Sequence, residues 1–239
     1  MKECNIILSK TENYLNSAIK IKSSAKIKVN IIWIEEFMMQ EEKEKRLENS
    51  ILYFLCNTPL VKELVDLLEN TNCYIFNEEF FKKNDTKLEI QEMLIKNQID
   101  TPKIITDYKE KGIKIPIFCK ENSHAGMVFQ AYTKSTIEEF FEKFDTTKFY
   151  LEEVINGEEV KYYYVNQRIY AKDNLEISDK IRQVCKKVAN LLRLEVFSID
   201  FIKSKEGYKV IDVNPAAGFY MLDSAREDLI NEIERMWKR

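Results

Sequence analysis

The stretch Tyr208–Tyr220, YKVIDVNPAAGFY, places an acid and an amide on one predicted strand, just before a Pro-Ala-Ala-Gly break. Val210 and Ile211 are β-branched and favour an extended backbone. Side chains alternate along a strand with period two, so Asp212 and Asn214 share one side of it. Two oxygen donors on one face are typical of a metal site. A polar strand end without a ligand is the alternative interpretation.

A second acid lies on the strand that precedes this one. Residues 195–214, EVFSIDFIKSKEGYKVIDVN, read as two strands joined at Lys205-Glu206-Gly207, which is a hairpin signal. Antiparallel pairing through this turn brings Asp200 close to Asp212. Mg²⁺ prefers hard oxygen donors and often bridges substrate phosphates. We therefore predict a magnesium site formed by Asp200, Asp212 and Asn214.

Length and composition limit the class of protein. The 239 residues suffice for one large domain or for two to three small lobes around a cleft. The chain has no apolar run of membrane-spanning length and no secretory h-region, so we expect no membrane insertion. Its five cysteines form no CxxC pair, which favours a reducing, cytoplasmic compartment over a disulfide framework or a zinc site. The net charge of −3 gives no reason to expect nucleic acid as a partner.

The first third of the chain reads as a small α/β lobe, residues 1–77. Apolar runs predict strands, and charged or periodic segments predict helices. Pro59 is tolerated in the first turn of the helix that follows Thr58. The predicted strands are 5–8, 29–34, 51–56 and 73–76, and the predicted helices are 10–24, 36–49 and the segment from 59 onward.

The remainder predicts an α+β arrangement in which helices alternate with hairpin-linked strands. We expect a linking helix region at 78–110, a central lobe at 111–155 and a C-terminal lobe with the metal site at 156–239. Pro116 suits an edge strand or a bulge. The predicted helices are 87–97, 135–144, 179–192 and 222–237, and the predicted strands include 113–120 and 148–155, the latter turning at Asn156-Gly157 into its hairpin partner region, 160–171.

Two further segments carry candidate nucleotide-binding groups. Lys120 ends an apolar strand and precedes ENSHAG, so it is placed to reach phosphates. Exposed strand backbone at Glu152–Val154 is suited to an adenine edge, and a carboxylate after the turn is suited to a ribose diol. Lys161 would point into the same cleft. A surface lysine and solvated strand ends are the alternatives for these groups.

Taken in order, these pieces resemble the ATP-grasp superfamily over residues 77–218. The matching pieces are Lys87 within NDTKLEIQEMLIKNQIDTPK, Lys120, the segment YLEEVINGEE at 150–159, Asp200, and the DVN of 212–214. The resemblance implies an ATP-grasp fold in which ATP lies between two lobes. It also implies that the late acid, acid and amide hold Mg²⁺, with two ions expected.

Within the superfamily, the chain resembles the inositol-phosphate kinases, of the inositol-trisphosphate and diphosphoinositol-pentakisphosphate types. Most ATP-grasp ligases have Glu as the second metal ligand, whereas Asp212 stands here. FCKENSHAGMVF at 118–129 and RLEVFSIDFI at 193–202 are also similar to those kinases. The implied function is transfer of the γ-phosphoryl group of Mg²⁺-ATP to an inositol polyphosphate or inositol pyrophosphate. The segment YLEEVINGEEVKYYYVNQRIYAK at 150–172 resembles the hinge region of the pyrophosphate-forming kinases, but its EEVINGEE part also resembles ligase hinges. The Lys120–His124 loop is shorter than in the trisphosphate kinases.

The resemblance implies a role for each matched residue. A basic segment, SKTENYLNSAIKIKSSAKIK at 9–28, would cover a phosphorylated small-molecule substrate, and a solvated lysine face is the alternative. The implied nucleotide ligands are Lys87, Lys120, Glu152, Glu153, Val154 and Glu159. The implied catalytic groups are Lys120, His124 and Lys161, and the implied substrate ligands are Lys20, Lys22, Lys26, His124, Lys161, Lys172 and Gly218.

Two other functions stay open at this point. A carboxylate–amine ligase that works through an acyl phosphate shares the ATP site but does not need the basic segment. A non-catalytic nucleotide-binding module is the other alternative.

Overall fold

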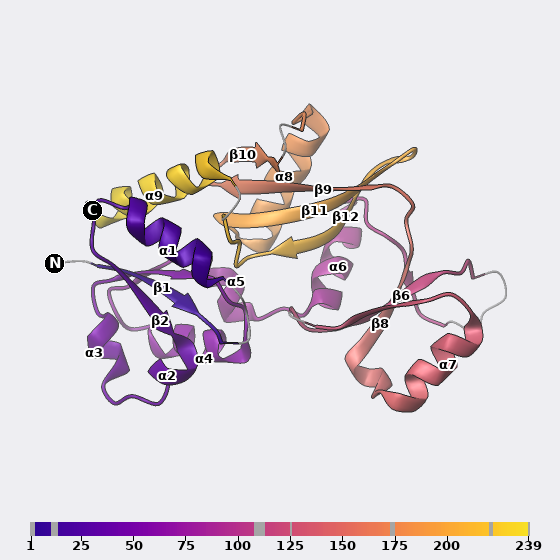
Figure 1. The fold of residues 1–239 in the computed structure, drawn as a ribbon, viewed down its shortest axis with the longest axis horizontal. Helices are drawn as coiled ribbons and strands as arrows, with labels where there is room; N and C mark the ends of the chain where they lie inside the picture. Colours follow the sequence, from indigo (N-terminus) through magenta and orange to yellow (C-terminus); the bar gives the residue numbers. More distant parts are fainter. Residues whose placement is uncertain are drawn as a thin grey trace. The chain divides into compact units, whose positions relative to one another are not determined.

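A computed structural model describes residues 3–10, 14–107, 113–124, 126–172, 175–219 and 222–238. The chain forms two compact units (Figure 1). The first unit contains Met1–Asn84, Lys161–Ile199 and Val213–Arg239, and the second contains Asp85–Val160 and Asp200–Asp212. The described part holds one parallel and two antiparallel four-stranded sheets together with helices, so the α+β class is confirmed.

The first unit begins with a parallel sheet in the order β2-β1-β3-β4. Buried apolar runs form its central strands, since every residue of β1 and of β3 is buried. A parallel sheet covered on both faces favours such runs. The strands are β1 (Cys4–Leu8), β2 (Val29–Trp33), β3 (Ile51–Phe54) and β4 (Tyr74–Ile75).

Helices α1 (Leu15–Ser24) and α4 (Pro59–Leu67) show how local sequence sets the helices of this unit. α1 buries Ser17, Ala18 and Ile21, one stripe of an otherwise exposed helix. Pro59 is the first residue of α4, as predicted, because a missing N–H costs nothing there. A short helix, α5 (Glu78–Lys83), follows β4.

The single helix predicted over residues 36–49 is wrong. Two short helices, α2 (Ile34–Phe37) and α3 (Lys43–Leu47), flank a turn. Within residues 36–49, Phe37 and Leu47 are the buried apolar residues. They are ten residues apart, so no continuous apolar stripe supports a single helix over this segment. The many charged residues of this segment suggested one solvent-exposed helix, and charge alone does not show where a helix ends.

The rest of the first unit comes from the second half of the chain. Its helices are α8 (Asp179–Leu192) and α9 (Asp223–Trp237), and its edge strand is β10 (Arg168–Ala171). Strands β9 (Glu158–Val165), β11 (Val196–Ser204) and β12 (Gly207–Asn214) contribute residues to both units, and the sheet order is β10-β9-β11-β12. Buried residues of α9, such as Leu229 and Ile233, share one core with β1 and β3.

A run of hydrogen bonds fixes the segment after β12. Tyr53 Oη donates to Ala217 O at 2.6 Å, and Asn77 Nδ2 donates to Pro215 O at 2.9 Å. A Cβ atom on Gly218 would lie 2.7 Å from Tyr14 Cδ1, so close packing against this ring requires glycine there. Packing against Tyr14 in the first unit therefore explains why glycine follows the Pro-Ala-Ala segment.

The second unit is built on an antiparallel sheet in the order β5-β8-β6-β7. Ile117, Cys119 and Leu151 form its core with Ile137 and Phe140 of the covering helix. Its elements are α6 (Lys87–Lys96), β5 (Ile104–Ile105), β6 (Ile117–Glu121), β7 (Val128–Ala131), α7 (Lys134–Lys143), the 3₁₀ turn η1 (Thr146–Lys148) and β8 (Phe149–Glu153).

Two expectations for the strands of this unit are wrong. Pro116 lies just before β6, and β6 is an interior strand between β8 and β7, so the proline marks neither an edge strand nor a bulge within it. The predicted hairpin from 148–155 into 160–171 does not form either. β8 pairs with β5 and β6, whereas β9 pairs with β10 and belongs to another sheet.

The connection between β8 and β9 explains the missing hairpin. A Cβ atom on Gly157 would lie 2.4 Å from the carbonyl oxygen of Lys203. The turn therefore crosses close over the backbone of β11 instead of folding β9 back onto β8. Glycine permits this approach because it has no side chain.

Candidate nucleotide site in the second unit

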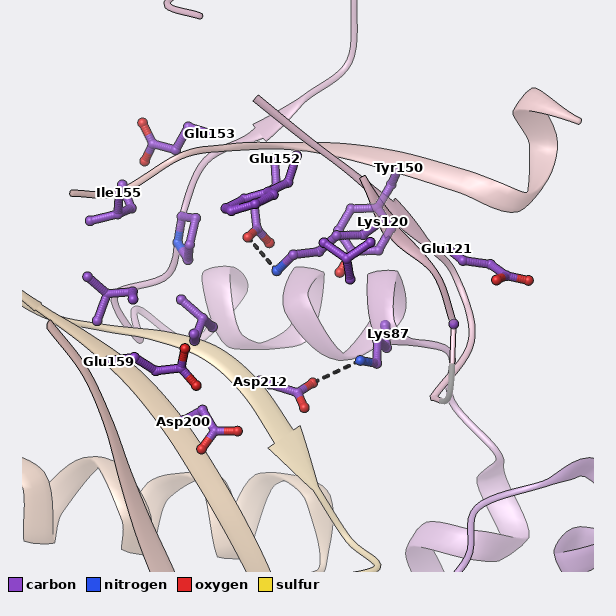
Figure 2. A pocket seen from close by; sticks show the side chains of 16 residues that line it. Lys87, Lys120, Glu121, Tyr150, Glu152, Glu153, Ile155, Glu159, Asp200 and Asp212 are labelled. Carbon is purple, nitrogen blue, oxygen red and sulfur yellow. Dashed lines mark ion pairs between the residues drawn. The ribbon is translucent and has the colours of Figure 1, made fainter. Parts of the chain in front are cut away.

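A pocket of about 360 Å³ lies in the second unit, and all its lining residues belong to that unit (Figure 2). Charged groups and apolar walls line it together. The charged residues are Lys87, Lys120, Glu121, Glu152, Glu153, Glu159, Asp200 and Asp212, and the others are Pro102, Phe118, Gly126, Val128, Tyr150, Ile155, Ile202 and Ile211. Seven of the residues predicted to bind nucleotide or metal are therefore gathered in one pocket.

Lys120 and Glu152 form the most deeply buried ion pair of this pocket. Lys120 Nζ lies 2.5 Å from Glu152 Oε1, and the side chains are 13% and 2% exposed. They come from the neighbouring strands β6 and β8. Burial raises the pKa of Glu152, and the charge and hydrogen bond of Lys120 oppose this rise. The buried carboxylate thereby holds the lysine at the pocket wall.

Lys87 faces Asp212 in a second ion pair, with Nζ 3.3 Å from Oδ1 (Figure 2). Lys87 is the first residue of α6. A capping box fixes that helix start, since Thr86 Oγ1 accepts from Glu89 N and the Glu89 carboxylate accepts from Thr86 N. Asp212 lies on β12, as predicted. The local sequence DTKLE thus places the lysine.

Two of the three predicted metal ligands, Asp200 on β11 and Asp212 on β12, line the pocket. Asn214 follows two residues beyond Asp212 on the same strand. Its Oδ1 accepts from Ala216 N at 2.9 Å, and its Nδ2 lies 3.3 Å from Tyr14 Oη. Two carboxylates and one amide are the donors that Mg²⁺ prefers, so the residues fit this ion. Among the described residues, no cluster of three or more His, Cys, Asp or Glu side chains forms a metal site.

Glu152 and Glu153 use their backbone in the sheet. Glu152 is opposite Ile104 on one side and Phe118 on the other, and Glu153 N donates to Lys103 O. The expectation of exposed strand backbone is therefore wrong for these two residues, because β8 is an interior strand. Val154 follows the end of the strand and does not line the pocket.

His124 lies in the second unit but does not line the pocket. Its Nε2 is 3.0 Å from Asp85 O, next to the start of α6. Nearby, Leu88 N donates to Asn122 Oδ1 at 2.8 Å. Burial lowers the pKa of His124, which favours the neutral ring. These contacts join the segment after β6 to the first turn of α6.

The remaining predicted site residues lie in the first unit. The lysine-rich segment is partly neutralised there, because Lys10 and Lys28 pair with Glu36 and Glu3. Lys22 and Lys26 are exposed. The predicted residues of this unit are Lys20, Lys22, Lys26, Lys161, Lys172, Asn214 and Gly218.

The apolar walls of the pocket were not predicted, although strand periodicity carries a signal for some of them. Phe118 lies two residues before Lys120, and Tyr150 lies two residues before Glu152. Ile202 lies two residues after Asp200. Stepping by two from each charged residue predicts these neighbours, since alternate residues share a face. Ile155 and Pro102 lie outside the strands, and their contribution depends on the tertiary fold.

Comparison with known proteins identifies the fold. No family model and no curated protein match the sequence. D-alanine–D-alanine ligase from Bacillus anthracis, solved with ATP, is similar with a TM-score of 0.75 at 16% identity. The match covers 99% of this chain and 97% of the ligase chain. The ATP-grasp ligase PsnB, solved with precursor peptide PsnA2 and AMPPNP, has a TM-score of 0.70 at 15% identity and covers 99% and 98%.

A third similar structure is a RimK domain ATP-grasp protein from Sphaerobacter thermophilus, with a TM-score of 0.74 at 11% identity and coverage of 99% and 100%. These matches show that the chain has the predicted ATP-grasp fold. None of the three is an inositol-phosphate kinase, so the narrower resemblance has no support among them. Within the described residues, no helix has the length and apolar character needed to cross a membrane.

Proposed function

We propose that the chain is a Mg²⁺-ATP-dependent carboxylate–amine ligase that activates its acid as an acyl phosphate. The observation that carries this proposal is the pocket of the second unit, where two lysines and several carboxylates line apolar walls. The likeness of the fold to two ligase structures supports the ligase branch.

The nucleotide is proposed to bind through both kinds of lining. Phe118, Tyr150 and Ile155 offer apolar surface for a base, and the backbone that follows β8 at Ile155 offers polar groups for its edge. Lys87 and Lys120 are proposed to hold the phosphates. Glu159 is proposed to accept hydrogen bonds from the ribose. Glu152 keeps Lys120 in place. Glu153 forms an ion pair with Lys209, whose Nζ lies 3.2 Å from Glu153 Oε1.

Asp200, Asp212 and Asn214 are proposed to hold Mg²⁺, with Asn214 assigned from the period of strand β12. When bound, the ion neutralises negative charge on the β- and γ-phosphates. PsnB has been solved with Mg and ADP, which agrees with a cation requirement in this fold.

The proposed reaction has two steps. An oxygen of the substrate carboxylate forms a bond to the γ-phosphorus, and the bond from that phosphorus to the bridging oxygen breaks, so ADP leaves. The nitrogen of an amine then attacks the acyl carbon, inorganic phosphate leaves and the nitrogen loses a proton, giving an amide. Lys87 and Lys120 offset the charge of the transferred group in the first step. No residue is assigned as the base of the second step.

Phosphoryl transfer to an inositol polyphosphate or pyrophosphate is the second candidate. Asp212, where most ligases of the superfamily have Glu, favours it. This reading assigns His124 and Lys161 to catalysis. It assigns the acceptor's phosphates to Lys20, Lys22, Lys26, His124, Lys161, Lys172 and Gly218.

Product identity separates the two functions. The protein is incubated with labelled ATP, Mg²⁺ and either amino-acid and peptide pairs or a panel of inositol phosphates. We expect an amide product, ADP and phosphate, and loss of this turnover in Asp212→Asn. Asp66→Asn, an exposed aspartate paired with Lys62, is the matched control that keeps activity. A phosphorylated inositol product would favour the second candidate, and full turnover by Asp212→Asn would refute the metal assignment.

A further inference from the structure

The charge balance of the pocket raises a question about how its ligands enter. Its lining includes six carboxylates and two lysines, and a third lysine, Lys209, pairs with one of these carboxylates, Glu153, so the carboxylates outnumber the lysines. Both lining lysines are already paired, Lys120 with Glu152 and Lys87 with Asp212. A pocket of this sign repels a free nucleotide, which is itself highly negative. The nucleotide therefore needs a cation to enter.

The two ion pairs differ in how easily they can be exchanged. Glu152 is 2% exposed and Lys120 13%, with 2.5 Å between the charged atoms. Lys87 and Asp212 are 21% and 35% exposed, with 3.3 Å between them. A longer, more exposed pair contributes little free energy and separates more readily. Lys87–Asp212 is thus the pair that a ligand can open.

We propose that Lys87 occupies the place of the cation at Asp212 until nucleotide arrives. An ammonium beside Asp212 opposes the binding of a free divalent ion to the same carboxylate. Phosphate oxygens attract Lys87 away from Asp212, and the carboxylate becomes available to the ion that accompanies the nucleotide. The inference rests on the proposed function, because it takes Asp212 as a metal ligand and Lys87 as a phosphate ligand.

This arrangement couples the two ligands. Free nucleotide is disfavoured by the acidic lining, and free cation is disfavoured by Lys87. Each ligand removes the obstacle to the other, so their binding is cooperative, and the coupling is reciprocal by linkage. Lys87 is here a positioning residue for the ion as well as a ligand for the phosphates.

The structure predicts an unusual result for a substitution in a binding site. Lys87→Met should bind a free cation more tightly than the parent protein when nucleotide is absent. The probe is Mn²⁺, and the free ion is measured by electron paramagnetic resonance in a titration of the full chain. We expect an affinity at least about threefold higher, the effect of losing a partly exposed ion pair. Lys87→Arg keeps the charge and should bind Mn²⁺ like the parent.

Lys96→Met is the matched control, because Lys96 lies in the last turn of the same helix and is exposed. Its Mn²⁺ affinity should not change. An unchanged or weaker affinity in Lys87→Met overturns the inference, provided that Asp212→Asn loses Mn²⁺ binding. If Asp212→Asn binds Mn²⁺ like the parent, the metal assignment of the proposed function fails instead. Circular dichroism of each variant shows that it is folded.

Discussion

At the scale of single residues, Lys120 and Glu152 illustrate how a site residue depends on a buried partner. Glu152 is 2% exposed, and its carboxylate is satisfied by Lys120 and by a hydrogen bond from Gln91. Removing one partner of a buried pair leaves an uncompensated charge, whereas removing both does not. The Lys120–Glu152 pair therefore affects the free energy of unfolding as well as the position of the lysine.

We expect Lys120→Met to lower the free energy of unfolding by about 3 kcal/mol, because it leaves the Glu152 carboxylate buried and unpaired. Lys120→Met combined with Glu152→Gln should recover most of that loss. Urea denaturation measures both. Lys62→Met, which breaks an exposed pair with Asp66, is the control and should change stability by less than about 1 kcal/mol. Equal losses in the single and double variants would contradict this account.

His124 gives a prediction about pH. Burial lowers its pKa below the ordinary value of 6.5, so the unfolded chain binds a proton at a pH where the folded chain does not. The neutral, buried His124 ring contributes to the free energy of unfolding above the pKa that this residue has in the unfolded chain. This contribution is lost as the pH falls from that pKa toward the lower pKa of the folded chain. We expect His124→Asn to lose less stability than the parent between about pH 7 and pH 5. Thermal melts at the two pH values test this, and identical losses would argue against it.

The sequence predicted charged residues of this site better than their partners. Lys120, Asp200 and Asp212 stand out because each interrupts or ends an apolar strand. That Glu152 would neutralise Lys120 depends on the register between β6 and β8, which strand periodicity does not specify. The burial of His124 depends likewise on the contact between two loops.

At the scale of elements, Asn77 shows how one side chain joins several segments of the first unit. It is 2% exposed, and its φ of 59° lies in the left-handed region. Its Nδ2 donates to Val196 O at 2.5 Å and to Pro215 O at 2.9 Å. Its Oδ1 accepts from Glu195 N and Val196 N. The end of β4 is thereby tied to the start of β11 and to the segment after β12.

We expect Asn77→Ala to cost about 3 kcal/mol, because it leaves buried backbone groups without partners and strains a left-handed position. Asn84→Ala is a matched control, since Asn84 has a φ of 54° but is exposed. It should cost about 1 kcal/mol from the backbone alone. Chemical denaturation of both variants gives the difference, and equal costs would mean that the hydrogen bonds of Asn77 contribute nothing.

Elements with strong local signals were predictable. The helix predicted over 179–192 is observed as α8 with the same bounds, because its buried residues follow a helical stripe and Ser178 caps its start. The pairing of β11 with β12, which a short turn at Gly207 joins, was predicted correctly, but the partner of residues 148–155 was not. Residues 148–155 and 160–171 both have strand character, yet the turn at Gly157 sends them to different sheets.

At the scale of the whole molecule, ligand binding should stabilise the fold. A ligand that binds only the folded chain adds about 2.7 kcal/mol at a concentration of 100 Kd, which corresponds to a rise of about 5–10 °C in Tm for a protein of this size. We expect this rise with a non-hydrolysable ATP analogue and Mg²⁺. Chelation of the cation should remove most of it. An equal rise without any divalent ion would contradict a cation-dependent pocket.

The order of short motifs was sufficient to predict the fold of the whole chain. The functional branch was not predictable to the same degree. Both proposed functions assign Asp200, Asp212 and the two lysines to phosphoryl transfer from ATP, so these residues do not separate a carboxylate acceptor from an inositol phosphate.

The five cysteines give the molecule a built-in set of chemical probes. Four are buried, and Cys73 is half-buried. Cys119 is the one cysteine within the sequence ranges of the second unit, and burial raises its pKa to about 11. A buried thiol of high pKa reacts only when its surroundings open. In a Cys73→Ser background, alkylation of Cys119 would therefore time the opening of the second unit, and alkylation of Cys4, Cys56 and Cys185 that of the first.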